Sequence, residues 1–330
     1  MNCRFSFGHQ KPLEEMNRLF VIYNPQAGRG KAQAVWPQIY QSLLAHGMQV
    51  EIKTTNAPLH AKDLAMEAEG RGFQAVVAVG GDGTIHEVAN GLLQVSGGGS
   101  SFPMGIIPVG NGDDFIKMLP PLPEIGQQGY SWAVAVARIA SGKRHRVDVG
   151  SLRAFHQDGS DAGHRYFVNG VNLGFSAHAA FNFSTIPRFL TGFLGYLAAV
   201  LKTLWKYPLL DLTVQVDGQE THTLQSSMVA VMNGRCFGRA FWVCPQADVQ
   251  DGVLDMMIAK KINQWTILQK IPLMMKGSHL NDPLLQWFRG ARISIASPRP
   301  LIVEMDGEIP FSDVFRVEIE TLPGRLEVLV

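Results

Sequence analysis

The clearest chemical pattern in the chain is a glycine-rich segment that carries one carboxylate. Residues 80–91 read GGDGTIHEVANG and directly follow the apolar run AVVAV at 75–79. Glycines let backbone N–H groups approach anionic oxygens, and the N-terminus of a following helix adds its dipole. Asp82 alone would repel a phosphate, so it indicates either a Mg²⁺ ion between the two or contact with an acceptor hydroxyl. The segment therefore predicts phosphoryl transfer more than nucleotide storage.

Other phosphate and metal motifs are excluded. The nearest match to a P-loop, PQAGRGKA at 25–32, lacks the first glycine and the final hydroxyl residue. The dinucleotide pattern GxGxxG fails after Gly83, and the HRD and DFG signatures of protein kinases are not present. His86 and Glu87 begin an HExxH-like pattern, but its last position is Asn90. We expect His86 to be a surface or packing residue and Glu87 to cap or orient the helix after the loop.

Composition favours a two-domain protein of the cytoplasm. The 330 residues exceed one usual core, and 46% are hydrophobic and 17% charged. A net charge of +1 gives no basic field for nucleic acid, and the three cysteines form no CxxC pair. Residues 1–18 read as an extension without a secretory signal. The longest nearly apolar stretch, 189–201, falls short of the about 20 residues of a transmembrane helix.

The first half of the chain alternates strand and helix patterns. Strands are expected at 19–23, 48–54, 75–79 and 104–109, and helices at 34–45, 57–72 and from the glycine loop to about 95. This alternation predicts a parallel sheet covered on both faces. Because ligands bind beyond the carboxyl ends of such strands, the loops 24–30, 80–83 and 110–114 should share one crevice.

From about residue 147 short alternating runs predict an antiparallel sandwich or barrel, interrupted by helices near 187–206 and 263–277. Asp217-Gly218 is a strong hairpin signal. Asp251-Gly252 and Asp306-Gly307 could be turns of the same kind. The stretch 189–201, followed by Trp205 and Tyr207, fits an acyl-chain cleft but is explained more simply as a buried helix. The expected strands lie at 166–173, 212–216, 228–232, 254–259, 301–305, 314–319 and 326–330.

Taken together, these residues resemble the diacylglycerol kinase catalytic family, in its soluble bacterial lipid kinase branch, which is related to sphingosine and ceramide kinases. The resemblance covers nearly all of residues 19–330. It implies an α/β ATP-binding domain over 19–146, a β-sandwich lipid-substrate domain over 147–330, and an active site between them. Its anchors are Asn24-Pro25 with Ala27-Gly28, the loop 80–84 with Glu87 and 90–92, GIIP at 105–108, VDVG at 147–150, Asp251-Gly252 and Asp306-Gly307-Glu308.

The resemblance also implies the roles of individual residues. Glu308 would be the general base, with Asp306 and Asp82 as nearby acids, and Asp148 would be a further carboxylate facing the cleft. A structural Mg²⁺ would use the Asp251 side chain with main-chain oxygens of Asp248 and Val253. ATP contacts are implied at Asn24, Pro25, Ala27, Gly28, Thr55, Gly80, Gly81, Asp82, Gly83, Thr84, Glu87 and Asn111.

We therefore predict an ATP- and Mg²⁺-dependent lipid kinase of phospholipid metabolism. Diacylglycerol is the first acceptor, followed by sphingoid bases and phosphatidylglycerol. The enzyme would work peripherally at the inner membrane face, and a homodimer is compatible with the sequence. One alternative is an NAD kinase-like enzyme with a soluble acceptor. A non-catalytic lipid or nucleotide sensor is another, because GNGDDF at 110–115 departs from the usual Gly-Thr-x-Asn-Asp-Phe at Asn111 and Asp113.

Overall fold

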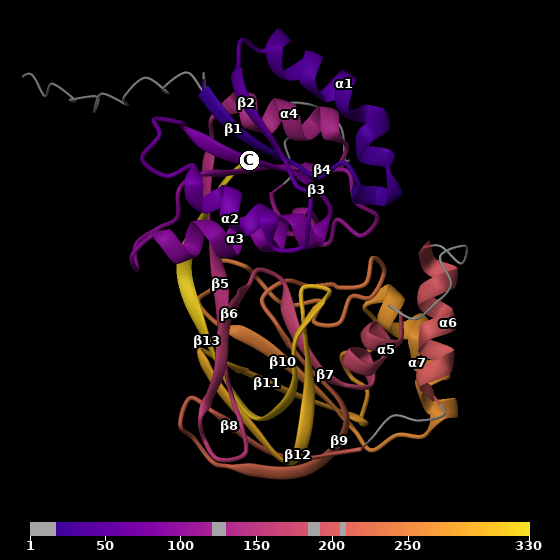
Figure 1. The fold of residues 1–330 in the computed structure, drawn as a ribbon. Coiled ribbons are helices and arrows are strands. Elements are labelled where there is room, and N and C mark those ends of the chain that lie inside the picture. The colour runs from indigo at the N-terminus through magenta and orange to yellow at the C-terminus, as the bar shows by residue number, and fades with distance from the viewer. Residues whose placement is uncertain (1–17, 121–129, 184–191, 205–208) are drawn as a thin grey trace, which may run out of the picture.

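The N-terminal half is a parallel sheet in the order β2-β1-β3-β4 with helices on both faces (Figure 1). The structure is a computed structural model that describes residues 18–120, 130–183, 192–204 and 209–330. The elements of this half are β1 (Arg18–Tyr23), the 3₁₀ turn η1 (Ala27–Arg29), α1 (Lys31–Ala45), β2 (Gln49–Thr54), α2 (His60–Glu67), β3 (Ala75–Gly80), α3 (Asp82–Val95), β4 (Met104–Pro108), the 3₁₀ turn η2 (Phe115–Met118) and α4 (Trp132–Ser141).

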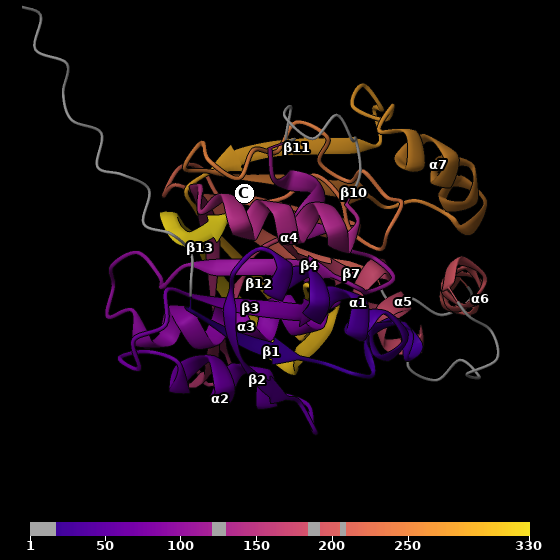
Figure 2. The same cartoon turned by 90° about the horizontal axis from the view of Figure 1, so that it is seen from above.

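Alternate residues of the buried strands divide between two cores, as the period of a strand requires. On one face, Val76 and Ala78 of β3 pack with α2 and α3, including Ile85 and Val88. On the other face, Val77 and its alternate neighbours pack with α1 and α4. Figure 1 shows α1 and α4 on one side of these strands and α2 and α3 on the other, and Figure 2 looks down on the side of α1 and α4. The expected parallel sheet, covered on both faces, is therefore confirmed.

The C-terminal half is antiparallel and sandwich-like, with three helices packed at one side (Figure 1). Strand β12 pairs with β8 in its first part and with β7 in its last part, so the strands bend around one apolar core. The elements are β5 (Arg144–Phe155), β6 (Asp161–Phe167), β7 (Gly170–Gly174), α5 (Phe175–Phe183), α6 (Gly192–Leu204), β8 (Leu210–Val216), β9 (His222–Met232), β10 (Leu254–Lys260), α7 (Gln264–Lys276), β11 (Leu285–Gly290), β12 (Arg292–Met305) and β13 (Glu308–Leu329).

Two long strands join the halves. Strand β13 pairs with β5 along most of its length, and near its end Val328 pairs in parallel with Met104 of β4. Leu326 and Val328 accordingly lie in the same core as Phe20 of β1. The chain therefore ends inside the first sheet, and the expected division between residues 146 and 147 falls within β5.

Some expected elements differ from the structure. The expected strand 166–173 is wrong as a single element, because it breaks at Val168 and Asn169, whose N–H groups bind a side chain described below. The hairpin at Asp217 is confirmed, with φ of 49° there and 70° at Gly218. The expected extension and residues 187–191 and 205–206 of the expected helix lie outside the described residues, apart from Arg18, which begins β1. Among the described helices, none has the length and apolar character to cross a bilayer.

Candidate active site

Three loops meet at the carboxyl ends of β1, β3 and β4, as the sequence predicts. Asn24 Nδ2 donates to Thr84 Oγ1 at 2.9 Å, which joins the first loop to the glycine loop. Gly28 has φ of 60°, and a Cβ there would lie 2.3 Å from the Val109 carbonyl oxygen. A Cβ at Gly81 would lie 3.1 Å from the Cα of Gly110. The close backbone contacts explain why glycines occupy these positions.

Helix α3 begins inside the glycine loop, with Gly81 as its N-cap and Asp82 as its first residue. The first N–H groups of a helix lack carbonyl partners one turn earlier, so they point toward any anion placed at this end. A Cβ at Gly80 would lie 2.4 Å from Thr84 Oγ1, so the turn closes only around a glycine. Of the other implied ATP contacts, Ala27 is buried and Thr55 follows β2, its N–H donating to the Tyr23 carbonyl. Pro25 lies in the turn between β1 and η1.

Asp82 is a buried carboxylate in a cluster of acids. Its Oδ1 accepts from the Asp114 N–H at 2.7 Å. Burial, and next the charge of Asp114, raise the pKa of Asp82 to about 7. Asp114 in turn binds Lys117 Nζ at 2.6 Å and the Arg239 N–H at 2.9 Å. The cluster therefore connects the glycine loop to a C-terminal loop. It also keeps the pKa of Asp82 near neutral pH.

Asp113, one of the two residues at which the segment 110–115 departs from the usual family pattern, takes part in the structure of this loop. Asp113 has φ of 52°, and its Oδ1 accepts from the Gly110 N–H at 3.1 Å. Burial raises its pKa, although the charges of Lys31 and Lys117 oppose this. The Asp113 carboxylate thus closes a tight turn, while Asn111 lines the cavity described below.

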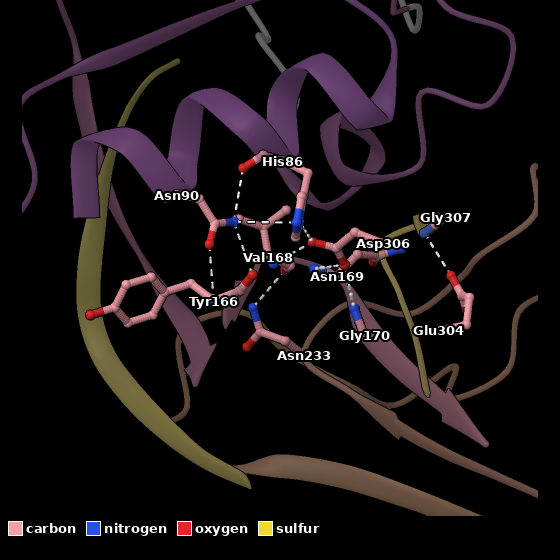
Figure 3. A network of polar contacts seen from close by, with 10 residues as sticks. All are labelled: His86, Asn90, Tyr166, Val168, Asn169, Gly170, Asn233, Glu304, Asp306 and Gly307. Carbon is pink, nitrogen blue, oxygen red and sulfur yellow. Dashed lines mark hydrogen bonds and ion pairs between the residues drawn. The ribbon is translucent and has the colours of Figure 1, made fainter. Parts of the chain in front are cut away.

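Asp306 is saturated with hydrogen-bond donors (Figure 3). Its Oδ1 accepts from the N–H groups of Asn169 and Gly170, both at 2.9 Å. Its Oδ2 accepts from the Val168 N–H at 2.8 Å and lies 2.9 Å from His86 Nδ1. The side chain is only 2% exposed, and Asp306 itself has φ of 48° in the β12–β13 turn. This carboxylate therefore holds backbone in place and has no free oxygen for a substrate proton.

His86 is buried on the same network, so of the two expected alternatives the surface position is wrong. Burial by itself would lower the pKa of His86, but the Asp306 hydrogen bond and the charges of Asp306, Glu308 and Glu87 raise it overall. One turn later, Asn90 donates to the Tyr166 carbonyl and accepts from the Tyr166 N–H, each at 3.0 Å (Figure 3). The side chains of His86 and Asn90 therefore attach α3 to the C-terminal half.

Two further glutamates lie beside α3. Glu87 accepts from the N–H groups of Leu59 and Ala61, so it caps α2 rather than its own helix. Glu308, the implied base, lies close to the glycine loop, since a Cβ at Gly83 would be 3.6 Å from its Oε1. Burial raises the pKa of Glu308, while the charge of His86 opposes this. The implied base and the glycine loop are therefore brought together.

A cavity of about 310 Å³ lies between the two halves. Asp82 and Asp306 line it, but Glu308 does not. A second, apolar pocket of about 80 Å³ adjoins it, because Ser176 and Phe237 line both. The large cavity is lined by Arg29, Asp82, Asn111, Gly112, Asp114, Phe115, Val168, Asn169, Gly170, Asn172, Ser176, Ala180, Phe237, Gly238, Arg239, Glu304, Asp306 and Gly307.

Asp148 does not face this cavity, contrary to expectation. It is 2% exposed, and its two oxygens accept from the N–H groups of Gly252 and Gly324, each at 2.7 Å. Backbone turns therefore saturate it, and it orders the loop that contains the implied metal ligands.

Of the implied Mg²⁺ ligand atoms, which are the Asp251 side chain and main-chain oxygens of Asp248 and Val253, the Asp251 carboxylate already has other partners. Asp251 Oδ2 forms an ion pair with Arg289, and Asp251 Oδ1 accepts from the Val253 N–H. Asp248 Oδ1 accepts from the Gln250 N–H. Among residues 18–120, 130–183, 192–204 and 209–330, no three His, Cys, Asp or Glu side chains gather as metal ligands. As arranged here these residues do not fit a bound Mg²⁺, because a guanidinium already neutralises Asp251.

Several residues of the site carry no sequence motif of their own. Glu304 is buried, and burial and the charge of Asp306 raise its pKa to about 7, against hydrogen bonds from Gly307 and Asn172. Asp114 binds Lys117, three residues later in the chain, and the N–H group of Arg239, which lies in a distant loop. The one signal that could have pointed to Glu304 is its position two residues before Asp306.

Comparisons with known proteins agree with this architecture. The family described as "Diacylglycerol kinase catalytic domain" matches residues 18–152, and "YegS C-terminal NAD kinase beta sandwich-like domain" matches residues 169–330. A diacylglycerol kinase of Bacillus subtilis is 27% identical over 297 residues, or 89% of this chain and 90% of the relative.

Solved structures share the fold at lower identity. A diacylglycerol kinase from Bacillus anthracis superposes with a TM-score of 0.67 at 21% identity, covering 96% of this chain and 97% of the other. An NAD kinase from Archaeoglobus fulgidus, solved in complex with ATP, superposes with a TM-score of 0.50 at 15% identity, covering 95% and 93%. These likenesses concern the fold, and they extend over 95–96% of this chain.

Proposed function

Because the chain belongs to the diacylglycerol kinase catalytic domain family, we propose that it transfers the γ-phosphoryl group of ATP to the hydroxyl of a lipid alcohol. The single observation that carries the proposal is the junction of two pockets. A cavity lined by Asp82 of the phosphate loop and by other charged side chains adjoins a small apolar pocket between the sheet and α7. An amphiphilic acceptor fits this junction, with its head in the cavity and the beginning of a chain at the apolar pocket. Diacylglycerol ranks first among acceptors on the names of the relatives.

The N-terminus of α3 supplies the binding site for phosphate. Its free N–H groups and dipole favour the triphosphate at Gly83 and Thr84. Mg²⁺ carried by ATP would neutralise charge on the phosphates. Phosphoryl transfer depends mainly on such positioning and neutralisation.

Two carboxylates compete for the role of general base. Glu308 is the one that the family resemblance implies, and it lies against the glycine loop. Asp82 is the one that lines the cavity, and its pKa of about 7 suits proton transfer near neutral pH. We propose that Asp82 takes the proton of the acceptor hydroxyl and that Glu308 orders the loop at Gly83. Asp306 joins the β12–β13 turn to α3, so it fixes the position of Glu308 relative to Asp82 without touching the reactants.

Exposed apolar side chains support a peripheral approach to the membrane. Phe181 of α5, Leu201 of α6 and Trp265 of α7 are 49%, 43% and 70% exposed. These helices pack side by side at one flank of the C-terminal half, and residues of all three line the apolar pocket or its neighbouring core (Figure 1). A membrane-bound acceptor could enter the pocket from that flank. Location at the inner face, a role in phospholipid synthesis and a homodimer remain predictions.

The two alternatives are weaker on specific grounds. An NAD kinase-like enzyme with a soluble acceptor would leave the adjoining apolar pocket without a role. A non-catalytic sensor was suggested by Asn111 and Asp113, but the Asp113 carboxylate closes its own turn. The departure at Asp113 therefore has a structural role in the loop and does not argue against turnover.

Radiolabelled ATP with Mg²⁺ and diacylglycerol in mixed micelles tests the proposal. A labelled organic-phase product, missing with the Asp82→Asn variant, is the expected result. NAD in place of lipid tests the first alternative, and ATP binding without any turnover would favour the sensor. A labelled product on NAD alone would overturn the lipid assignment.

A further inference from the structure

Strand β7 presents a polar face to the large cavity. Val171 and Leu173 point into the sandwich core, so the alternate residues Gly170 and Asn172 face the other way. Asn172 pairs directly with Glu304 across the β7–β12 ladder. Opposite residues of an antiparallel pair lie side by side on one face, and here both line the cavity.

This polar face is tightly arranged. Asn172 Nδ2 donates to Glu304 Oε2, and the Gly307 N–H donates to Glu304 Oε1 at 2.6 Å. Because its amide nitrogen is engaged, the Asn172 side chain turns its Oδ1 away from Glu304 as a pure acceptor. Asn172 and Glu304 are 1% and 4% exposed, so the pair is held rigidly.

Three buried polar atoms of residues that line the cavity lack a hydrogen-bond partner within the described residues: Asn169 Oδ1, Asn172 Oδ1 and Ser176 Oγ. Asn172 and Ser176 belong to β7 and the start of α5, and Ser176 is 4% exposed. Buried polar atoms in native proteins almost always have a partner, because leaving them unpaired costs stability. Since both residues line the cavity, a molecule bound there can supply the missing partner.

The position of Ser176 indicates which part of a ligand would be near it. It lines both the polar cavity and the apolar pocket, so it marks the boundary between a lipid head and its chain. The charges indicate the kind of head. Arg29 and Arg239 line the cavity together with several acids, but the charged group beside Asn172 is Glu304, so a donor is favoured over an anion at this face.

We infer that Asn172, Ser176 and Glu304 form a subsite for a second hydrogen-bond donor in the head of the lipid acceptor. The donor would be a hydroxyl, amide or ammonium group next to the hydroxyl that is phosphorylated. A monoacylglycerol or a sphingoid lipid carries such a group, whereas diacylglycerol carries only its reacting hydroxyl. The inference rests on the proposed function and refines its acceptor.

Paired acceptors test the subsite. The ratio of kcat/KM for 1-monooleoylglycerol over 1,2-dioleoylglycerol is measured in the same mixed micelles for the wild type, Ser176→Ala and Asn172→Leu. We expect a ratio of about ten or more in the wild type, and a loss of at least about threefold from that ratio in each variant, since an unpaired polar group in the site rejects the wrong acceptor. Ser151→Ala, a buried serine outside both pockets, is the matched control and should keep the ratio.

A second measurement separates this inference from the proposed function. The thermal shift caused by each lipid is recorded without ATP, and melts without lipid check that each variant folds. No turnover together with a larger shift for monooleoylglycerol, lost in Ser176→Ala, would refute the kinase and keep the subsite. Turnover with a wild-type ratio of one or less, or with equal losses for both lipids in the variants, would overturn the subsite. Unchanged selectivity in both variants would mean that water alone satisfies these atoms, and would also overturn it.

Discussion

His86 Nδ1 lies 2.9 Å from Asp306 Oδ2, and this contact joins helix α3 to the turn between β12 and β13. The first turn of α3 carries Asp82, and the residue two places after Asp306 is Glu308. The contact therefore sets the distance between the two carboxylates of the proposed mechanism. Because three backbone N–H groups also fix Asp306, the turn cannot follow α3 if the contact is lost.

Replacement of His86 tests this connection. We expect His86→Leu to lower the free energy of unfolding by about 1–3 kcal/mol, because a buried carboxylate loses one donor. His86→Asn can keep a hydrogen bond to Asp306 and should be milder. Turnover should fall in the same order, since the glycine loop and Glu308 would no longer be held in register.

The pH dependence of this contact has a definite sign. The pKa of His86 is raised in the folded protein above 6.5. Its stabilising contribution is therefore fully present below pH 6.5 and is lost as the pH rises through the folded value. The difference in melting temperature between wild type and His86→Asn should therefore shrink as the pH rises from about 6 to about 9. This range begins near the ordinary pKa of histidine and extends above it. A constant difference would mean that the pair is neutral.

Asp82→Asn and Glu308→Gln separate the two candidate bases. We expect each to lose most turnover, with about 10²–10⁴-fold for the group that takes the proton. Because the pKa of Asp82 is about 7, wild-type kcat/KM should fall below that pH as the carboxylate becomes protonated. The residual activity of Glu308→Gln should keep this inflection, and that of Asp82→Asn should lack it. The reverse result would assign the base to Glu308.

Because the pKa of Asp82 is raised in the folded state, its ionised form lowers the free energy of unfolding at high pH. The folded state binds a proton there between pH 3.8 and about 7 that the unfolded state releases, so stability contributed by Asp82 falls as the pH rises through this window. Asp82→Asn should therefore melt higher than the wild type at pH 8, with a smaller difference at pH 5. A lower melt at pH 8 would show that the loss of activity reflects misfolding.

The sequence predicts the elements whose patterns are local. The glycine loop, the parallel strands and the Asp217 turn follow from residues that are close in the chain. Helix α4 is missed because WAVAVARIAS alternates like a strand, although Ser131 caps it and Gly142 ends it in the left-handed region. The break at Val168 is missed because its cause, Asp306, lies 138 positions away.

Long-range partners also explain what the sequence leaves out of the site. His86 and Asp306 are 220 positions apart, so no local pattern pairs them. Lys117 is close to Asp114 in the chain, but the Arg239 N–H that donates to Asp114 comes from 125 positions away, and the Arg239 carbonyl also accepts from Lys117 Nζ. The carboxylates at 82, 306 and 308 predict acid–base chemistry. Which of them keeps an oxygen without hydrogen bonds depends on backbone donors that only the fold brings together.

The loop at 110–115 allows a test of nucleotide binding. Asn111→Thr with Asp113→Asn restores the usual pattern of the family. Asparagine tolerates the left-handed conformation of Asp113, so the turn should persist. Because one acid next to the phosphates is removed, we expect the KM for ATP to fall by a few-fold, with the lipid KM unchanged. No change in the ATP KM would place this loop outside the nucleotide site.

Removal of divalent cations tests the role of Arg289. Its guanidinium pairs with Asp251, and its Nε lies 3.7 Å from Asp255 Oδ2 on the neighbouring strand. Burial raises the pKa of Asp255, and the charge of Arg289 opposes this. A cation of the chain itself therefore occupies the place where the family resemblance implies a structural Mg²⁺.

We expect the melting temperature of the wild type without nucleotide to be the same in EDTA and in Mg²⁺. Arg289→Gln should melt lower in EDTA and recover with Mg²⁺, because Asp251 and Asp255 then lack a countercharge and can bind a hard cation through oxygen. Arg316→Gln is the matched control, since it removes an exposed ion pair with Glu318 and should respond to neither condition. A wild-type melt that drops in EDTA would restore the Mg²⁺ site at Asp251. An Arg289→Gln variant indifferent to Mg²⁺ would instead mean that Arg289 is only a surface partner and that Asp251 and Asp255 need no countercharge.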